Sequence, residues 1–353
     1  APPKLKLKVK KANAKANAKA NAKADTGKKT IKLKLKPKLD LSKIPKEYMV
    51  PKEDKIVPEV WELPNRKTFP KWFHTTYEKY KAKKNSMEAA GKGEGFKFFN
   101  HQKLVRDYLQ LTSPYRGILL FHGLGVGKTC ASIAISEGFR SGRKIIVLLN
   151  KSLKTNFQVN LMKCGFEMFR INQHWIHHKF VGKDDPMLNL AKYLKLPTRS
   201  GEAWFVDFTK PPNYETLTGK QQESLNKQIE QMIKNKYKFI HLDGLNEKSL
   251  ARIQETNEFD DSLLIIDEVH NLTNAMSKLR PGVRGRNLKK IIMNAKNLKM
   301  VFLSGTPMIN NLFEVGQLFN LLRGFIINFQ FTLTPVGAKK ESFDSVVKAL
   351  RKI

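Results

Sequence analysis

The fold is decided by residues 117–129, which read GILLFHGLGVGKT. The apolar run at 117–121 is typical of a buried strand, and a helical pattern follows Lys128 as far as Phe139. Glycines between a strand and a helix let backbone N–H groups turn towards a phosphate, where the helix dipole also favours an anion. The stretch is therefore interpreted as a phosphate-binding loop, although His122 stands where the general pattern has its first glycine.

Each residue of this loop has an expected role. Gly123, Gly125 and Gly127 shape the loop around the phosphates of ATP. Lys128 reaches the β and γ phosphates, and Thr129 holds Mg²⁺. Taken alone, the loop could also be a coincidental glycine turn, so the rest of the chain has to support this interpretation.

Four more short apolar runs alternate with helical patterns, at residues 144–149, 237–242, 262–266 and 299–303. Continuous apolar strands separated by helices are typical of a parallel sheet that is covered on both faces. We therefore predict an α/β fold with a doubly wound parallel sheet. The irregular, basic stretch at about 158–236 is interpreted as an insertion between two strands.

Two acids follow the apolar run at 262–266, in the sequence Asp267-Glu268-Val269-His270. The carboxyl ends of parallel strands meet at one edge of the sheet, so these acids should approach the phosphate loop. Asp267 would then hold Mg²⁺ and Glu268 would polarise the attacking water. By itself, such a pair of acids could equally be a capping feature.

Small hydroxyl residues follow the run at 299–303, in the sequence Ser304-Gly305-Thr306-Pro307. They can hydrogen-bond the acid motif and sense whether phosphate is present, although alone they would pass for an ordinary turn. We predict that His270, Ser304 and Thr306 couple nucleotide hydrolysis to movement, because they lie between the acids and the nucleic-acid track.

The three motifs in this order resemble those of the superfamily 2 helicases. GLGVGKT resembles motif I, DEVH at 267–270 motif II, SGTP at 304–307 motif III, and residues 145–157 motif Ia. The resemblance implies a RecA-like first helicase lobe that hydrolyses ATP with Mg²⁺, and that uses Lys128, Asp267 and Glu268 as its catalytic residues.

Two further sites follow from the same resemblance. Residues 99–102 resemble the adenine-reading glutamine motif, with Gln102 as the reader. Motif Ia residues contact the nucleic-acid backbone in this family, which points to Lys151 and Lys154.

A narrower resemblance is to the helicase-like ATPases of large nucleocytoplasmic DNA viruses, which include the poxvirus early transcription factor ATPase subunit and the nucleoside triphosphate phosphohydrolase. It rests on His122, residues 237–246, DEVHNL at 267–272, and SGTPMINN at 304–311 followed by LFNLLRG at 318–324. It implies a transcription-associated viral protein that acts in the cytoplasm or is packaged in a virion.

Charge is concentrated at the front of the chain. Lysine and arginine number 65 against 31 acids, for a net charge of +34, and the first 38 residues hold 14 lysines and a single acid, Asp25. We predict a disordered basic arm at 1–42 that binds nucleic acid, DNA or RNA. A solubilising tail or a segment that binds an acidic protein are the alternatives.

The remaining boundaries follow from composition. Residues 43–95 are predicted to be a proline-rich connector with a packing helix, because aromatic residues recur from Trp72 to Tyr80 at helical spacing. The ATP-binding lobe is expected at 96–325, and 326–353 would begin a following segment. A second helicase lobe or the transcription machinery is an expected partner. The second lobe would supply an arginine finger, which contributes ~10³ to 10⁵ in the rate of phosphoryl transfer. Without that lobe we expect poor activity, and a fragment or split protein is favoured over a decayed ATPase.

The chain has only two cysteines, Cys130 and Cys164. They are too few for a disulfide framework, so we expect two buried free thiols and a reducing compartment. No run approaches the ~18 apolar residues of a membrane span, so a membrane partner is not expected.

The leading hypothesis is therefore the ATP-binding lobe of a nucleic-acid motor. The alternative is a structural nucleic-acid-binding protein that uses its arm and keeps the lobe as a scaffold. A small-substrate kinase is disfavoured, because the motifs at 267–270 and 304–307 and the basic surplus would then have no common purpose.

Overall fold

The computed structural model describes residues 6–8, 46–48, 55–81, 96–121, 123, 127–140, 142–182, 184–277, 283–308, 312–325 and 332–334. The chain divides into two units, and each is described by itself. One unit comprises Ala1–Pro37 with Phe325–Ile353, and the other comprises Lys38–Gly324.

A five-stranded parallel sheet forms the centre of the larger unit, with the strand order β2-β8-β7-β3-β6. Its strands are β2 (Gly117–Phe121), β3 (Lys144–Leu149), β6 (Tyr237–His241), β7 (Ser262–Ile266) and β8 (Lys299–Ser304). Each strand lies within one residue of its predicted range, and the fold class is confirmed. The strands were predictable from their apolar runs, and the three inner strands β8, β7 and β3 are buried on both faces of the sheet.

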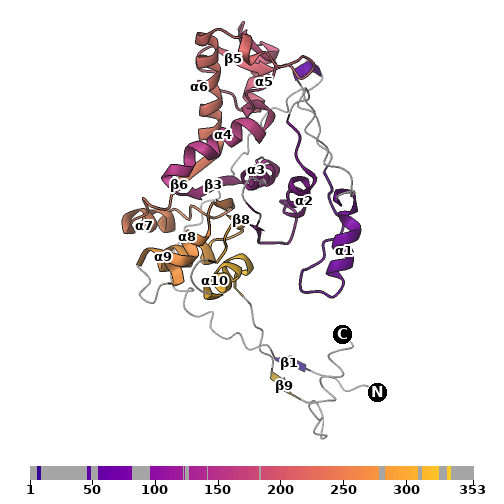
Figure 1. Cartoon of the computed structure of the whole chain (residues 1–353), viewed down its shortest axis with the longest axis vertical. Helices are drawn as coiled ribbons and strands as arrows, with labels where there is room; N and C mark the ends of the chain where they lie inside the picture. Colours follow the sequence, from indigo (N-terminus) through magenta and orange to yellow (C-terminus); the bar gives the residue numbers. More distant parts are fainter. Residues whose placement is uncertain are drawn as a thin grey trace, which may run out of the picture. The chain divides into compact units, whose positions relative to one another are not determined.

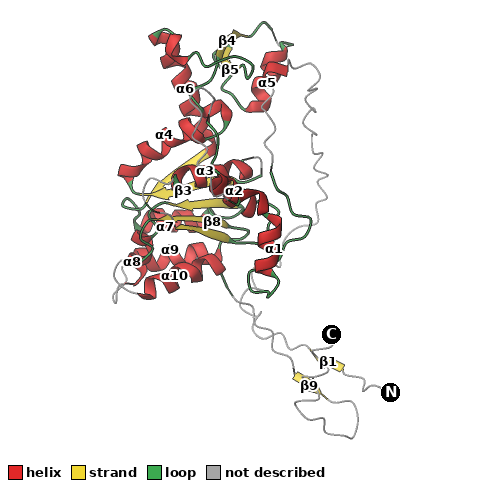
Figure 2. Ribbon diagram, turned by 45° about the vertical axis from the view of Figure 1, so that its right-hand side comes forward, coloured by secondary structure: helices red, strands yellow, loops and turns green. Residues whose placement is uncertain are grey.

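Helices cover both faces of this sheet (Figure 2). On one side lie α2 (Asn100–Tyr108), α3 (Lys128–Phe139), α4 (Lys154–Cys164) and α6 (Gly219–Lys236). On the other side lie α7 (Glu247–Glu255), α8 (His270–Ser277), α9 (Val283–Asn294) and α10 (Leu312–Arg323).

Alternate residues of each strand belong to two separate hydrophobic cores. Along β3, Ile145, Val147 and Leu149 lie in the core beneath α3, whereas Ile146 and Leu148 lie in the core beneath α9. All five residues are fully buried. This is the doubly wound arrangement, in which a strand has no solvent-facing side.

The segment between β3 and β6 contains structure of its own (Figure 1). It holds α4, η5 (Glu167–Phe169), β4 (Trp175–Lys179), α5 (Pro186–Leu194), β5 (Glu202–Val206), η6 (Tyr214–Thr216) and α6. β4 and β5 form an antiparallel pair that is separate from the main sheet. This segment thus connects two neighbouring parallel strands of the sheet.

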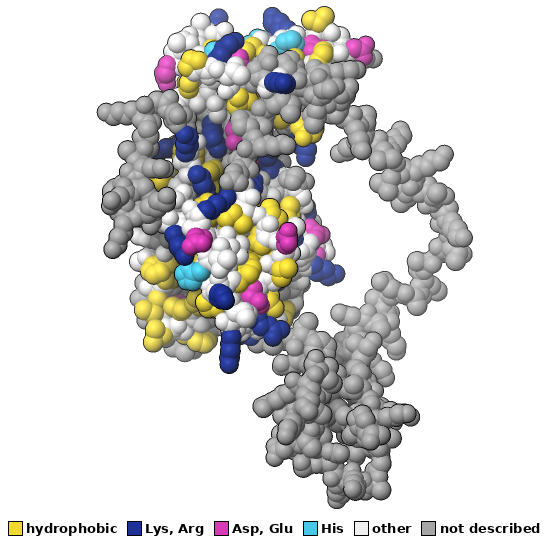
Figure 3. Space-filling model, turned by 90° about the vertical axis from the view of Figure 1, so that its right-hand side faces the viewer, with side chains coloured by type: hydrophobic (Ala, Val, Ile, Leu, Met, Phe, Trp, Pro, Cys, Tyr) yellow, Lys and Arg dark blue, Asp and Glu magenta, His cyan; other side chains and the backbone are white. Residues whose placement is uncertain are grey.

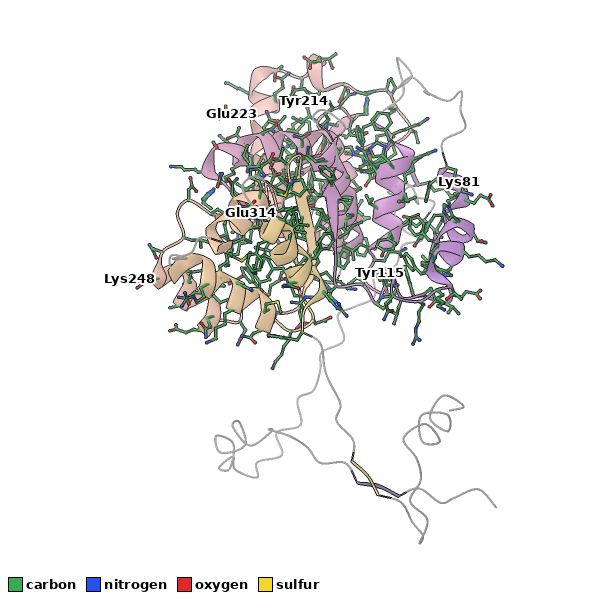
Figure 4. The ribbon with its side chains drawn as sticks, turned by 60° about the horizontal axis from the view of Figure 1, so that its bottom comes forward. Lys81, Tyr115, Tyr214, Glu223, Lys248 and Glu314 are labelled. Atoms are coloured by element: carbon green, nitrogen blue, oxygen red, sulfur yellow. A yellow bond between two sulfur atoms is a disulfide. The ribbon has the colours of Figure 1, made fainter. Side chains whose placement is uncertain are left out.

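The segment before α2 contains η2 (Lys46–Tyr48), α1 (Phe69–Thr76) and η3 (Glu78–Tyr80). Its aromatic side chains pack on α2 and on the loop that follows α2. The ring of Phe73 lies 5.9 Å from that of Tyr108, and Tyr108 stacks on Tyr115 at 4.4 Å. Tyr115, labelled in Figure 4, donates a hydrogen bond of 2.7 Å to the carbonyl oxygen of Glu62.

A buried carboxylate on α2 fastens the same segment. Asp107 is 0% exposed and accepts hydrogen bonds from the backbone N–H of Ile56 at 2.8 Å and the Tyr80 hydroxyl at 2.5 Å. Its second oxygen pairs with Arg106 at 2.7 Å. The hydrogen bonds join α2 to two points of the preceding segment that are far apart in the sequence.

The smaller unit differs in part from the predicted disordered arm. β1 (Lys6–Lys8) pairs antiparallel with β9 (Thr332–Thr334), because the alternating lysines and leucines of this stretch have the period of a strand. The rest of the arm and the predicted short helix near 342–350 lie outside the described residues.

The prediction of two free thiols is wrong. Cys130 and Cys164 form a disulfide, with a Cα–Cα distance of 5.8 Å. Cys130 lies in the first turn of α3 and Cys164 ends α4, and these two helices pack against each other. Residues 34 positions apart thus meet through tertiary packing, which a count of cysteines does not reveal. The reducing compartment inferred from free thiols stays a prediction.

Among the described residues, no helix is both long enough and apolar enough to cross a membrane.

Replacing Asp107 with Ala should destabilise the protein by about 3 kcal/mol, because Arg106, 4% exposed, loses the carboxylate that offsets its buried charge. Urea denaturation measures this change. Glu78→Ala is the matched control, since its ion pair with Lys81 is exposed and should change stability by less than about 0.5 kcal/mol. Equal stability of the two variants would contradict the assignment of Asp107 as an anchor.

Candidate functional site

The predicted motifs meet at one edge of the sheet. β8 lies between β2 and β7, so the loop after β2, Ser304 at the end of β8 and Asp267 after β7 follow three neighbouring strands. All three strands are parallel, and their carboxyl ends therefore share an edge.

Gly127 is required at the start of α3 for two reasons. Its φ of +76° lies in the left-handed region, which favours glycine. A Cβ atom at this position would also lie 2.6 Å from Nε2 of Gln102, so the end of that side chain would have to move away from the loop. The loop conformation and the position of Gln102 therefore depend on each other.

Gln102 is 2% exposed and connects α2 to the phosphate loop. Its Nε2 donates to the carbonyl oxygen of Gly127 at 3.2 Å, and its Oε1 accepts from the backbone N–H of Phe99 at 3.0 Å. An amide has two donor hydrogens and two acceptor lone pairs, so one of each remains for a base. The predicted adenine reader thus also positions the loop.

Lys128 and Thr129 are the first two residues of α3, where backbone N–H groups have no partner within the helix. Nζ of Lys128 donates to the carbonyl oxygen of Gly123 at 3.2 Å, so the lysine lies across the loop that precedes it. His122 and Gly125, both named from the sequence, lie outside the described residues.

The two acids after β7 differ in environment. Burial, together with the charge of Glu268, raises the pKa of Asp267 to about 6, although the backbone N–H of Glu268 and the charge of Lys128 oppose the shift. That N–H donates to Oδ1 of Asp267 at 3.0 Å. Glu268 has a φ of +48°, a strained value for a residue with a side chain, and such strain is concentrated at functional sites.

The residues at this edge fit Mg²⁺ bound together with a nucleotide. Asp267 and Thr129 offer a carboxylate and a hydroxyl oxygen, the hard ligands that Mg²⁺ prefers. Mg²⁺ usually takes one or two carboxylates and completes its shell with water and phosphate oxygens. The part of the chain that the structure describes holds no cluster of three or more His, Cys, Asp or Glu side chains that could bind a metal ion.

The predicted coupling residues are in direct contact. Nδ1 of His270 lies 3.1 Å from Oγ of Ser304 and 3.2 Å from Oε2 of Glu268. Oγ of Ser304 also accepts from the backbone N–H of Thr306 at 3.1 Å, and Ser304 is fully buried. A chain of polar contacts therefore runs from Glu268 to the loop after β8. The contact between Glu268 and His270 was not expected from the sequence.

The predicted nucleic-acid lysines follow β3, which β8 and β7 separate from β2. The backbone N–H of Lys151 faces the carboxylate of Asp243 at 3.3 and 3.4 Å, and Nζ of Lys154 lies 5.8 Å from the ring centre of Phe239. Asp243 belongs to the stretch 237–246, which the sequence singled out without giving it a role. Its contact places that stretch beside motif Ia.

Comparisons with known proteins agree with this geometry. The SNF2-related domain family matches residues 66–330. Protein L377 of Acanthamoeba polyphaga mimivirus, named as an ATP-dependent RNA helicase, is 30% identical over 283 residues, which cover 75% of this chain and 21% of that protein. The termination factor NPH-I homolog of African swine fever virus is 27% identical over 213 residues, covering 60% of this chain and 23% of the relative.

A solved structure, the Sulfolobus solfataricus SWI2/SNF2 ATPase core in complex with dsDNA, is similar with a TM-score of 0.34 and 16% identity, covering 63% of this chain and 35% of that one. The chain spans less than a quarter of the length of the two viral relatives. The resemblance to viral helicase-like ATPases is confirmed by these relatives.

Replacing Asp267 with Asn should stabilise the metal-free protein at pH 7. The pKa of Asp267 rises from 3.8 to about 6 on folding, so its contribution to stability is lost as the pH rises from about 4 to about 6. The amide cannot ionise, and Asp267→Asn should therefore gain about 1–3 kcal/mol above this range and flatten the profile.

Chemical denaturation between pH 4 and pH 8 measures this difference. The control is Asp184→Asn, because Asp184 is exposed and its substitution should leave the profile unchanged. A parallel pH profile for wild type and Asp267→Asn would contradict the pKa shift.

Proposed function

The chain belongs to the SNF2-related domain family, and from this premise we propose that it is the ATP-binding lobe of a nucleic-acid-dependent ATPase that serves viral transcription. The observation that carries the proposal is that the phosphate loop, the two acids and Ser304 follow neighbouring strands at one edge of the sheet. There the phosphate loop is joined to Gln102, and the acids are joined to Ser304 through His270.

The site supports nucleotide binding through its own residues. Lys128 exchanges the carbonyl oxygen of Gly123 for phosphate oxygens, and the backbone N–H groups at the start of α3 face the remaining phosphate charge. Gln102 uses its remaining donor and acceptor to select adenine. Mg²⁺, when bound by Thr129 and Asp267, neutralises charge that develops on the phosphates.

Hydrolysis requires a base, and Glu268 is placed for this role. Its carboxylate is partly exposed, and its contact with Nδ1 of His270 fixes its orientation. Glu268 takes a proton from the attacking water, and a positioned base of this kind contributes ~10²- to 10⁴-fold in rate. His270 contacts both Glu268 and Ser304, and the Ser304 hydroxyl accepts a hydrogen bond from the backbone N–H of Thr306. A change in the protonation of Glu268 therefore alters the contacts of the loop after β8.

Nucleic acid is the partner that the charge favours. A net charge of +34 attracts polyanions, and Lys151 and Lys154 follow the strand next to the acid motif. The names of the viral relatives refer to RNA helicase activity and to termination, and these names support a role in transcription.

Nucleotide binding is tested by calorimetric titration with Mg-ATP. Lys128→Ala should bind at least about tenfold more weakly, because a charge-assisted hydrogen bond is lost. Gln102→Ala should lose its preference for adenine over guanine nucleotides. The control is Lys248→Ala, since Lys248 is exposed on α7. Equal affinities of wild type and Lys128→Ala would refute the proposed site.

Nucleic-acid binding is tested by the salt dependence of affinity. The double variant Lys151→Ala/Lys154→Ala should bind more weakly, and its slope of log affinity against log salt should be shallower by ~0.9 per lost contact on duplex or ~0.7 on single strands. Fluorescence anisotropy with random-sequence oligonucleotides measures both quantities. A slope equal to that of Lys248→Ala would remove these lysines from the interface.

A further inference from the structure

A pocket that is separate from the site at the sheet edge lies beside α2. It measures about 370 Å³, within the ~300–1,000 Å³ range of ligand pockets. Three segments line it: Lys79 and Tyr80 of η3, residues between Phe96 and Arg106, and Arg170 after η5. Tertiary packing therefore assembles this pocket from parts that are distant in the sequence.

The pocket is strongly basic. Its cationic side chains are Lys79, Lys97, Lys103, Arg106 and Arg170, and no acid lines it among the described residues. Acids outside the lining pair with two of them, Asp107 with Arg106 at 2.7 Å and Glu167 with Arg170 at 3.7 Å. Like charges that line one hollow repel one another, and a bound anion would lower that repulsion.

The walls of the pocket are aromatic and held in place. Phe96 and Phe98 meet edge to face, with ring centres 5.0 Å apart, and the guanidinium of Arg170 lies 5.3 and 5.9 Å from their centres. Tyr80 is buried and its hydroxyl is bonded to Asp107. Fixed rings beside cations are the features with which proteins hold a base and its phosphate.

The pocket and the ATP site use different sides of α2. Gln102 points to the phosphate loop, whereas Asn100, Lys103 and Arg106 line the pocket at a spacing of three residues along the helix. Figure 3 shows lysine and arginine side chains in the narrow middle part of the face that is turned to the viewer.

We propose that this pocket binds a phosphorylated nucleoside unit, with the base against Phe98 and Tyr80 and the phosphate between Lys103 and Arg106. The unit can come from a nucleic-acid strand or from a free nucleotide. If the ligand is part of a nucleic-acid strand, the inference rests on the proposed function and deepens it. The pocket then binds one unpaired nucleotide of the strand, in addition to the contacts at Lys151 and Lys154.

The test uses the full chain and two probes, a fluorescein-labelled oligothymidylate and thymidine monophosphate, because neither carries the adenine that Gln102 selects. Phe98→Ala should weaken binding at least about fivefold for whichever of the two probes the wild type binds. Lys103→Ala should weaken it as well and make the salt slope on the oligonucleotide shallower by ~0.7.

Two matched controls separate the pocket from general effects. Phe319→Ala removes an exposed ring on α10, and Lys248→Ala removes an exposed charge on α7. Figure 4 places Lys248 on the opposite side of the body from Lys81, which follows η3 directly. Both control variants should bind as wild type does.

A second measurement needs no variant. A 4-thiothymidine oligonucleotide, photo-crosslinked to the wild-type chain and mapped by mass spectrometry, should mark Tyr80, Phe96 or Phe98. Phe98-dependent binding of the oligonucleotide alone identifies a strand as the ligand, and Phe98-dependent binding of thymidine monophosphate identifies a free nucleotide; either result supports the pocket.

The proposal is overturned if Phe98→Ala and Lys103→Ala bind both probes as the controls do and crosslinks fall only elsewhere. If in that case Lys151→Ala/Lys154→Ala still weakens binding, the proposed function survives without the pocket. If wild type binds no oligonucleotide but binds thymidine monophosphate through Phe98, the pocket survives and nucleic-acid dependence fails.

Discussion

The parallel direction of the five strands is the constraint on which the rest of the structure depends. Because every strand runs the same way, every loop that follows a strand emerges at one edge, and the chemical residues need not be near one another in the sequence. The order of the strands then decides which loops are neighbours. β8 between β2 and β7 places Ser304 between the phosphate loop and the acids, so a hydroxyl can contact His270 on the adjacent loop.

α2 connects this edge to the rest of the larger unit. Within one helix, Gln102 bonds the phosphate loop, Asp107 bonds the segment from Ile56 to Tyr80, and Lys103 lines the basic pocket. All three residues belong to one helix of nine residues, Asn100–Tyr108. The segment before α2 therefore does more than join the arm to the lobe, since it fixes the helix that positions the nucleotide loop.

The sheet and the positions of the motifs could be predicted from the sequence because they depend on local patterns. Apolar runs such as 262–266 identify buried strands, and parallel strands bring their ends together without further information. Three other contacts depend instead on which distant segments pack together. They are the disulfide between Cys130 and Cys164, the hydrogen bonds of Asp107 and the contact of Asp243 with Lys151. The basic pocket was missed for the same reason, since Lys79 and Arg170 have no local pattern in common.

The two candidate sites gather charge of opposite sign, negative at the sheet edge and positive beside α2. At the sheet edge, burial and the neighbouring Glu268 make the ionised form of Asp267 unfavourable, and the backbone of Glu268 is strained. Beside α2, cations gather around a hollow. In the proposed states, Mg²⁺ at the first site and an anion at the second would each lower the repulsion between like charges. Local electrostatic cost of this kind persists only where the surrounding packing holds it, and beside the acids Val269 and Leu272 are buried in the core beneath α9.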